Sequence, residues 1–240
     1  MQKNNVVIIN PKSINVMKAV CNAVMLDIVD IVIFGNKDVI KSLCEELNFN
    51  SNLLNIIECN NEKEILSKFD NYKNNFIIDG VILDDIKNIK IKSCLRSKTI
   101  CHVVDFGVFK NSVYLIDRFN KIKIVGEMLH ELNIYDIKVG VVYNDPNWKN
   151  EILTGNIRFI DMDEIMSCEY KIILFESQEL KEQFINKVEQ LTLPRVAEIK
   201  KASNMYVFDA FGKQFKNIFF ELVFISKLTT LNSKINAKTS

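Results

Sequence analysis

A short basic stretch of the sequence carries the side chains best suited to holding a phosphoryl group. Arg96, Lys98 and Thr99 stand close together, just before an apolar run that is typical of a strand. Two cations followed by a hydroxyl group can grip phosphate oxygens at the entry of a strand. Three more lysines precede them: Lys87, Lys90 and Lys92. The alternative is a solvated basic loop, since the acidic pair Asp84 and Asp85 offsets part of this charge.

Two residues beside this stretch could act as a base or a nucleophile. His102 is a candidate catalytic base, because an imidazole exchanges a proton near neutral pH. A hydrogen-bonded structural histidine at the start of a strand is the alternative. Cys101 would be a nucleophile only if its thiol were activated, and no acid–base pair adjoins it in the sequence. We therefore expect Cys101 to be buried.

No metal site is predicted. The six cysteines are widely spaced and the two histidines lie far apart, whereas zinc needs a cluster of both. Scattered cysteines are typical of free thiols in a reducing cytoplasm. Asp161, Asp163 and Glu164 form an acidic group that could hold a divalent cation, with capping of a helix as the alternative.

Glycine is scarce in the sequence. The chain has 7 glycines and 3 prolines in 240 residues, whereas average usage is about 7% and about 5%. Glycine lets a backbone turn tightly around phosphate, so the shortage weighs against phosphate-cradling loops. There is no GxGxxG fingerprint for a dinucleotide. The turn Gly35–Lys37 would still lie at the carboxyl edge of a parallel sheet, where ligands often bind.

Charge and hydropathy exclude two classes of partner. Lys plus Arg number 31 and Asp plus Glu number 30, so no global field attracts nucleic acid. No apolar run reaches the roughly 18 residues that span a bilayer. The first residues lead directly into a strand-like run without a signal peptide, which predicts a cytoplasmic protein.

Val- and Ile-rich runs alternate with amphipathic segments along the chain, as in a doubly wound α/β fold with a mostly parallel sheet. The expected strands are Val6–Ile9, Ile31–Phe34, Asn55–Cys59, Phe76–Ile82, Cys101–Phe109, Ser112–Asp117, Ile137–Tyr143, Ile157–Ile160, Lys171–Phe175 and Met205–Phe208. The expected helices are Ser13–Ile28, Asp38–Glu46, Glu62–Phe69, Lys121–Leu132, Gln178–Leu191 and Lys213–Leu228, the first two capped by Ser13 and Asn36.

Two local features modify this pattern. Only Lys110 and Asn111 separate two of the strand-like runs, and two residues cannot make a crossover, so these runs should form an antiparallel hairpin. The last helix is apolar nearly all round, which predicts burial or a subunit interface. The segment Thr229–Ser240 after it is polar and is expected to fray.

The stretch from Leu95 resembles a known family motif. It has the sequence Leu-Arg-Ser-Lys-Thr-Ile-Cys-His-Val, and the phosphate acetyl/butyryltransferase family has Leu-Arg-Thr-Gly-Lys-Thr-x-Ser-His-Val. Weaker similarities follow in the same order over nearly the whole chain, beginning at Ile28, Tyr114, Ile134 and Ala202. The resemblance implies two α/β/α domains of the isocitrate/isopropylmalate dehydrogenase-like type with a cleft between them.

The family's activity is the transfer of a short acyl group between CoA and phosphate. The resemblance thus implies small-molecule substrates (acyl-CoA or acyl phosphate, and phosphate), coenzyme A as a substrate with no resident cofactor, and a homodimer. The positions it assigns to phosphate or CoA binding are Arg96, Lys98, Thr99, Asp117, Asn120 and Asn217. The resemblance also predicts the domain bounds. The expected first domain is 1–98 with part of the C-terminal region, and the expected second domain is 99–203, which includes the hairpin 101–117. A strand and the final helix follow at 204–228, and a polar tail at 229–240.

The sequence also departs from the family. The glycine expected after Ser97 is missing, Cys101 replaces a serine, and Asp79 replaces a lysine beside the expected anionic substrate. No Gly-Pro pair follows Gly155, and the family's late Ser-Arg and following Asp have no counterpart beyond Ser226. The alternative to an active acyltransferase is therefore an inactive relative that binds CoA, acyl phosphate or a protein partner.

Overall fold

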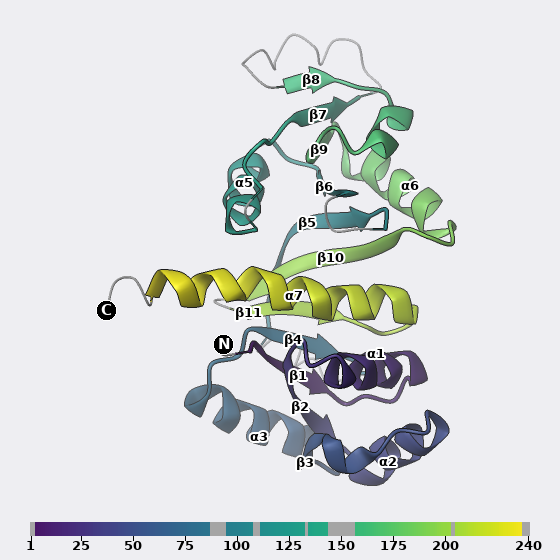
Figure 1. The fold of residues 1–240 in the computed structure, drawn as a ribbon, viewed down its shortest axis with the longest axis vertical. Coiled ribbons are helices and arrows are strands. Elements are labelled where there is room, and N and C mark those ends of the chain that lie inside the picture. The colour runs from purple at the N-terminus through teal and green to yellow at the C-terminus, as the bar shows by residue number, and fades with distance from the viewer. Residues whose placement is uncertain are drawn as a thin grey trace. The chain divides into compact units, whose positions relative to one another are not determined.

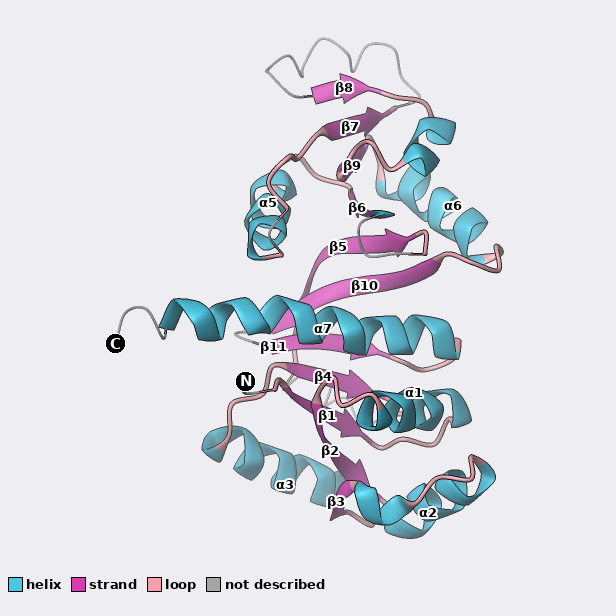
Figure 2. Cartoon of the chain, in the orientation of Figure 1, coloured by secondary structure: helices cyan, strands magenta, loops and turns pink. Residues whose placement is uncertain are grey.

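The computed structural model describes residues 3–86, 95–107, 111–132, 134–143, 157–202 and 205–236, with side chains except at 131 and 228–236. The chain divides into two compact units. Unit 1 comprises Met1–Lys98 and Lys200–Ser240, and unit 2 comprises Thr99–Ile199. Both units contain a β-sheet with helices packed against it (Figures 1 and 2).

Unit 1 is built on a mainly parallel sheet. Its strands are β1 (Asn5–Ile9), β2 (Asp30–Gly35), β3 (Asn55–Glu58), β4 (Gly80–Leu83) and β11 (Met205–Asp209), in the order β3-β2-β1-β4-β11. β1 is central, since Val7 lies opposite both Val32 of β2 and Val81 of β4. The last residues of β10 (Arg195–Ala202) pair antiparallel with β11.

The helices of unit 1 are α1 (Ile14–Met25), α2 (Lys37–Glu46), α3 (Glu62–Asn75) and α7 (Phe215–Asn236). Polar side chains cap the first three of them. The two predicted N-caps are confirmed. Ser13 accepts a hydrogen bond from the Asn15 N–H at 3.2 Å, and Asn36 accepts one from the Val39 N–H at 3.0 Å. Each cap satisfies amide groups that have no partner inside the helix.

Alternation along the buried strands gives the sheet of unit 1 two apolar faces. Val7 and Ile9 pack with Ile65 and Phe69 of α3 in one cluster. α1 and α7 pack against each other, and both run beside the sheet (Figure 2). Five apolar residues of α7 are fully buried, in line with the first of the two predicted alternatives: Ile218, Phe220, Leu222, Phe224 and Ile225 are each 0% exposed.

The strands of unit 2 follow the order β5-β6-β9-β7-β8. They are β5 (Lys98–Asp105), β6 (Ser112–Ile116), β7 (Val139–Val142), β8 (Ile157–Phe159) and β9 (Ile172–Phe175). The predicted hairpin is confirmed, because β5 and β6 are antiparallel with Val103 opposite Tyr114. The pairs β6–β9, β9–β7 and β7–β8 are parallel.

Two α-helices and a 3-10 helix cover the sheet of unit 2. They are α5 (Lys121–Glu131), α6 (Gln178–Glu189) and η4 (Met162–Ser167). Leu180, Phe184 and Val188 of α6 pack on Phe175 of β9 and so cover one face. Val125 of α5 is also fully buried.

The structure differs from the predicted elements in one strand that was not predicted and in several element ends. β10 was not predicted, because its sequence Arg-Val-Ala-Glu-Ile-Lys-Lys-Ala carries charge at half of its positions. β4 begins at Gly80 rather than Phe76, since α3 continues to Asn75. α7 continues to Asn236, past the end predicted at Leu228. Among the described residues no helix is both long and apolar enough to cross a membrane.

Replacing Gly80 by alanine should destabilise unit 1. A Cβ at this position would lie 2.5 Å from Cδ1 of Ile225, a fully buried side chain of α7. Overpacking of this kind costs about 1–3 kcal/mol of unfolding free energy. Gly126 of α5 is the matched control, because a Cβ there has nothing within 4 Å. Gly126→Ala should be neutral or stabilise the helix by up to about 1 kcal/mol. Urea unfolding of both variants checks this, and equal effects would contradict it.

Candidate functional site

In unit 2 the carboxyl ends of two neighbouring strands bring three charged side chains together. β6 and β9 are parallel, with Ile116 opposite Leu174, so the residues that follow them share one edge of the sheet. Asp117 follows β6 directly. Its carboxylate is 2.8 Å from Nζ of Lys121 and 2.6 Å from Nζ of Lys181. β6 leads through α5 to β7, and β9 leads through α6 in the opposite direction along the strand order. Ligands of open α/β sheets bind at such a switch point.

Lys181 lies on the buried side of α6. Ser177 caps this helix by accepting a hydrogen bond from the Leu180 N–H at 3.2 Å. The amphipathic pattern then places Lys181 among Leu180, Phe184 and Val188, and only 2% of it is exposed. A lysine is almost never buried to this degree unless it is paired. Asp117 is therefore needed to keep Lys181 in place.

The charges of this cluster do not cancel. Burial tends to raise the pKa of Asp117, but hydrogen bonds from Lys121 and Lys181 lower it to about 2. One carboxylate thus faces two ammonium groups, which leaves local positive charge suited to an anion. Asn120, also expected at the site, is exposed at the N-cap of α5 and makes no capping hydrogen bond through its side chain.

Cys101 and His102 are both in β5. Cys101 is 1% exposed, and burial raises the pKa of its thiol above the usual range, so it stays a protonated thiol. The expectation that Cys101 is buried is confirmed. His102 is half-buried and lies opposite Leu115 of β6. Its role as a base stays a prediction.

The basic stretch is placed only in part. Arg96 and Lys98 are exposed residues of unit 1, and Thr99 is a half-buried residue of unit 2. The Thr99 hydroxyl donates a hydrogen bond to Oε1 of Glu198 at 2.7 Å. The hydroxyl expected to hold phosphate therefore already has a carboxylate partner. Lys87, Lys90 and Lys92 lie outside the described residues.

A buried ion pair that the sequence did not reveal fixes the hairpin of unit 2. Asp105, at the end of β5, is 0% exposed and pairs with Arg195 of β10. Asp105 also accepts a hydrogen bond from the Ser112 hydroxyl at 3.0 Å. Its partner Arg195 is distant in the sequence, so no local pattern pointed to this contact.

α7 carries a polar group inside the apolar core of unit 1. Asn217 is 7% exposed, and Glu221, one helical turn later, is 0% exposed. Oε1 of Glu221 is 2.6 Å from Nζ of Lys213, while Oε2 has no hydrogen bond within the described residues. Burial raises the pKa of Glu221 to about 7, an effect that Lys213 partly opposes. The signal in the sequence was a single acidic residue within an apolar helix.

The N-terminus of α1 does not offer a phosphate site. Asp84, which follows β4 and is 2% exposed, accepts hydrogen bonds from the N–H groups of Lys12 and Ser13, each at 2.8 Å. These amides precede α1, next to the central strand β1, where a dinucleotide's phosphates would bind in a nucleotide-dependent enzyme. The protein's own carboxylate occupies that position, which agrees with the missing glycine fingerprint.

Two other acidic positions have structural partners. Asp79, at the amino end of β4, accepts a hydrogen bond from the Asn5 N–H at 2.8 Å. Glu164 of the acidic group accepts one from the Asp161 N–H at 2.9 Å, at the start of η4. The capping alternative therefore describes this group. Within the described residues no set of three His, Cys, Asp or Glu side chains could hold a metal ion.

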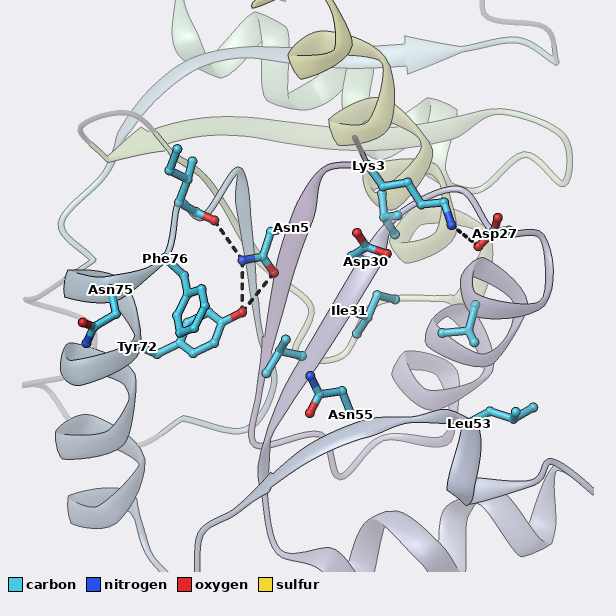
Figure 3. A pocket seen from close by; sticks show the side chains of 14 residues that line it. Lys3, Asn5, Asp27, Asp30, Ile31, Leu53, Asn55, Tyr72, Asn75 and Phe76 are labelled. Atoms are coloured by element: carbon cyan, nitrogen blue, oxygen red, sulfur yellow. Dashed lines mark hydrogen bonds and ion pairs between the residues drawn. The ribbon is translucent and has the colours of Figure 1, made fainter. Parts of the chain in front are cut away.

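A pocket of about 610 Å³ lies at the amino ends of the strands of unit 1 (Figure 3). Asn5 of β1, Asp30 of β2 and Asn55 of β3 line it, together with Tyr72 and Phe76 at the end of α3. It lies at the edge of the sheet opposite to the one where Asp84 follows β4. None of the residues predicted for phosphate or CoA lines it.

Three solved structures resemble this one over nearly its whole length. A branched-chain phosphotransacylase from Enterococcus faecalis V583 has a TM-score of 0.64 and 10% identity, covering 94% of this chain and 99% of that one. The EutD phosphotransacetylase from Staphylococcus aureus has a TM-score of 0.59 and 10% identity, covering 95% and 94%. A phosphotransacetylase from Streptococcus pyogenes has a TM-score of 0.60 and 13% identity, covering 96% and 94%.

This protein has the fold of the phosphotransacylases. The expectation of an α/β fold with a mostly parallel sheet and an antiparallel hairpin, of the phosphotransacylase kind, is thereby confirmed. No protein-family model matches the sequence, and no curated protein matches it. The similarity therefore rests on the arrangement of helices and strands, and the roles of individual residues stay predictions.

Replacing Asp117 by asparagine should destabilise unit 2 strongly. The change leaves the ammonium group of Lys181 buried beside a neutral amide, and removing one partner of a buried pair costs about 3–5 kcal/mol. Lys121, the second partner of Asp117, is less buried than Lys181 and adds less to this cost. We therefore expect the unfolding free energy measured in urea to fall by about 2–4 kcal/mol. Glu169→Gln is the control, since its pair with Lys138 at 3.0 Å is exposed and should contribute under about 1 kcal/mol. A loss of similar size in both variants would contradict the assignment.

Glu221→Gln should change how stability depends on pH. The native pKa of Glu221 is raised from 4.5 to about 7, so its contribution to stability is present below pH 4.5 and is lost as the pH rises toward 7. Glutamine imitates the protonated form and cannot ionise. Between about pH 4.5 and about pH 8, unfolding free energies should shift in favour of the variant by about 1–3 kcal/mol. A difference independent of pH would refute the buried titration.

Proposed function

We propose that this protein is a phosphate acyltransferase that moves a short acyl group between coenzyme A and phosphate. The reaction is acyl-CoA plus phosphate giving acyl phosphate plus CoA, and the reverse. The observation that carries the proposal is the likeness to three phosphotransacylases, which covers 94%, 95% and 96% of this chain. The proposed acyl chain is short, as in the family that the motifs resemble.

Both substrates are anions, so the protein must supply positive groups. Arg96 and Lys98 are exposed and available for phosphate oxygens. In unit 2, Lys121 and Lys181 give the Asp117 cluster its excess positive charge at the edge where ligands bind. In the proposed mechanism Arg96 and Lys98 bind the phosphoryl group and stabilise negative charge that develops on the acyl oxygen during transfer. Asn120 is exposed and would hydrogen-bond the CoA moiety, whereas Asn217, predicted for the same role, is buried in the core of unit 1 and is not available to CoA.

The thiol of CoA must lose a proton before it attacks acyl phosphate. His102 is the proposed base, since its half-buried imidazole is in the strand that begins with Lys98 and Thr99. In the forward direction the same imidazole, in its protonated form, returns the proton to the departing thiolate. Cys101 takes no part, because it is buried as a neutral thiol.

One observation favours the inactive alternative. Thr99 is hydrogen-bonded to Glu198, so a phosphate at Thr99 would meet a carboxylate and would have to displace it. Loss of catalysis with retained binding of CoA or acyl phosphate is therefore the second candidate. The proposal also includes the cytoplasmic location expected from the sequence and the homodimer that the resemblance implied. Sedimentation of the purified chain tests the dimer.

A CoA-release assay separates these candidates. With acetyl-, propionyl- or butyryl-CoA and phosphate, the full chain should release CoA, and CoA should raise its melting temperature. Arg96→Ala should lower kcat/KM by about 10- to 100-fold, because a cation that stabilises the transferring group is lost. Arg158→Ala is the matched control, since Arg158 is an exposed arginine of β8.

Each outcome is informative. A melting shift without turnover would reject the enzyme and retain the binding protein. If the assay shows no turnover and CoA causes no melting shift, both candidates are rejected. Equal losses in the two arginine variants would remove Arg96 from the site.

A further inference from the structure

The pocket in unit 1 has the size of a small-molecule site but not the charge of an anion site. Its volume of about 610 Å³ is within the range of about 300–1,000 Å³ that such sites occupy. Lys3 is the lysine in the pocket lining, and its positive charge is neutralised by an ion pair with Asp27. Asp30 adds a second carboxylate beside that pair (Figure 3). The lining is therefore net negative, so it suits a cation and repels phosphate or CoA.

Asp30 has its carboxylate available. The residue is exposed at the start of β2, and within the described part of the chain this carboxylate accepts no hydrogen bond and forms no ion pair. Its charge reaches Lys3, whose pKa is raised by the hydrogen bond to Asp27 and by attraction to Asp27 and Asp30. Asn55 begins the next strand, β3, and its exposed side-chain amide makes no hydrogen bond within the same residues. A carboxylate and an amide oxygen thus face the pocket from adjacent strands.

The opposite wall of the pocket is aromatic. The rings of Tyr72 and Phe76 stack with centroids 4.5 Å apart and planes at 24°. Phe76 remains 56% exposed, and Ile77 beside it is 83% exposed. Asn5 holds this wall in place, because its side chain donates to the Tyr72 hydroxyl at 3.1 Å and to the Ile77 carbonyl at 2.8 Å (Figure 3). An aromatic wall that is held by hydrogen bonds and left open to water favours a flat apolar partner.

We propose that this pocket binds a small organic cation in which an amine is joined to an aromatic ring. The ammonium group pairs with Asp30 and donates a hydrogen bond to the amide oxygen of Asn55. The ring lies against Phe76, where stacking and the attraction between a cation and an aromatic face both contribute. This site goes beyond the proposed acyl transfer, whose substrates are anions, and its test does not depend on that activity.

Titration with phenethylamine tests the proposal. In amide NMR spectra of the full chain, phenethylamine should shift the signals of Ile31, Asn55 and Tyr72, which line the pocket. Phenylpropionate has the same ring with a negative charge, and butylamine has the same charge without a ring. Both should bind at least about 10-fold more weakly, since each lacks one of the two contacts. Equal binding of either compound would overturn the proposal.

Two variants locate the contacts. Asp30→Asn and Phe76→Leu should each weaken phenethylamine binding by about 5- to 10-fold, because both side chains are exposed and the fold is retained. Asp163→Asn is the matched control, an exposed carboxylate of unit 2 whose loss should leave the affinity unchanged. Affinity unaffected by Asp30→Asn, or lowered equally by Asp163→Asn, would reject the site. If a variant does not fold, the wild-type shifts decide: shifts confined to residues outside the pocket reject it as well.

Discussion

Burial of parallel strands on both faces is the constraint from which the other features of this protein follow. A strand such as β1, with Val6 to Ile9 all 0% exposed, can pair in parallel with its neighbours only if helices cover both sides of the sheet. Between parallel neighbours the chain therefore returns through a helix, as α1 does between β1 and β2. As a result, the strands of each unit end at a common edge, and the polar residues that follow them gather there.

The two units use that edge in opposite ways. In unit 1 the carboxylate of Asp84 accepts hydrogen bonds from the N–H groups of Lys12 and Ser13. The edge of the sheet beside β1 is therefore already occupied by a carboxylate of the protein itself. In unit 2 a single carboxylate, Asp117, is surrounded by two lysines. An incoming phosphate therefore meets positive charge in unit 2 and negative charge beside β1. The two edges thus make unequal electrostatic contributions to any anionic substrate.

The features that could be predicted from the sequence are those that depend on residues close together in the chain. Ser13 and Asn36 were recognised as caps because a cap acts within three residues of itself. The antiparallel pairing of β5 and β6 followed from the short connection between them. β10 escaped prediction because its charges are balanced by distant partners, among them Asp105 for Arg195. Lys181 and Glu221 were missed for the same reason, since burial of a charge depends on tertiary contacts that no local pattern encodes.

Unit 1 is made from two separated stretches of the chain, with the whole of unit 2 between them. During synthesis the first four strands of unit 1 emerge without β11 and α7, the strand beside β4 and the helix whose Ile225 packs on Gly80. Their apolar surface stays uncovered until β11 and α7 have been synthesised, whereas unit 2 is one continuous stretch that is synthesised before them. Loss of α7 would therefore expose the apolar surface of β1 to β4, which are synthesised first, instead of affecting only the C-terminal segment.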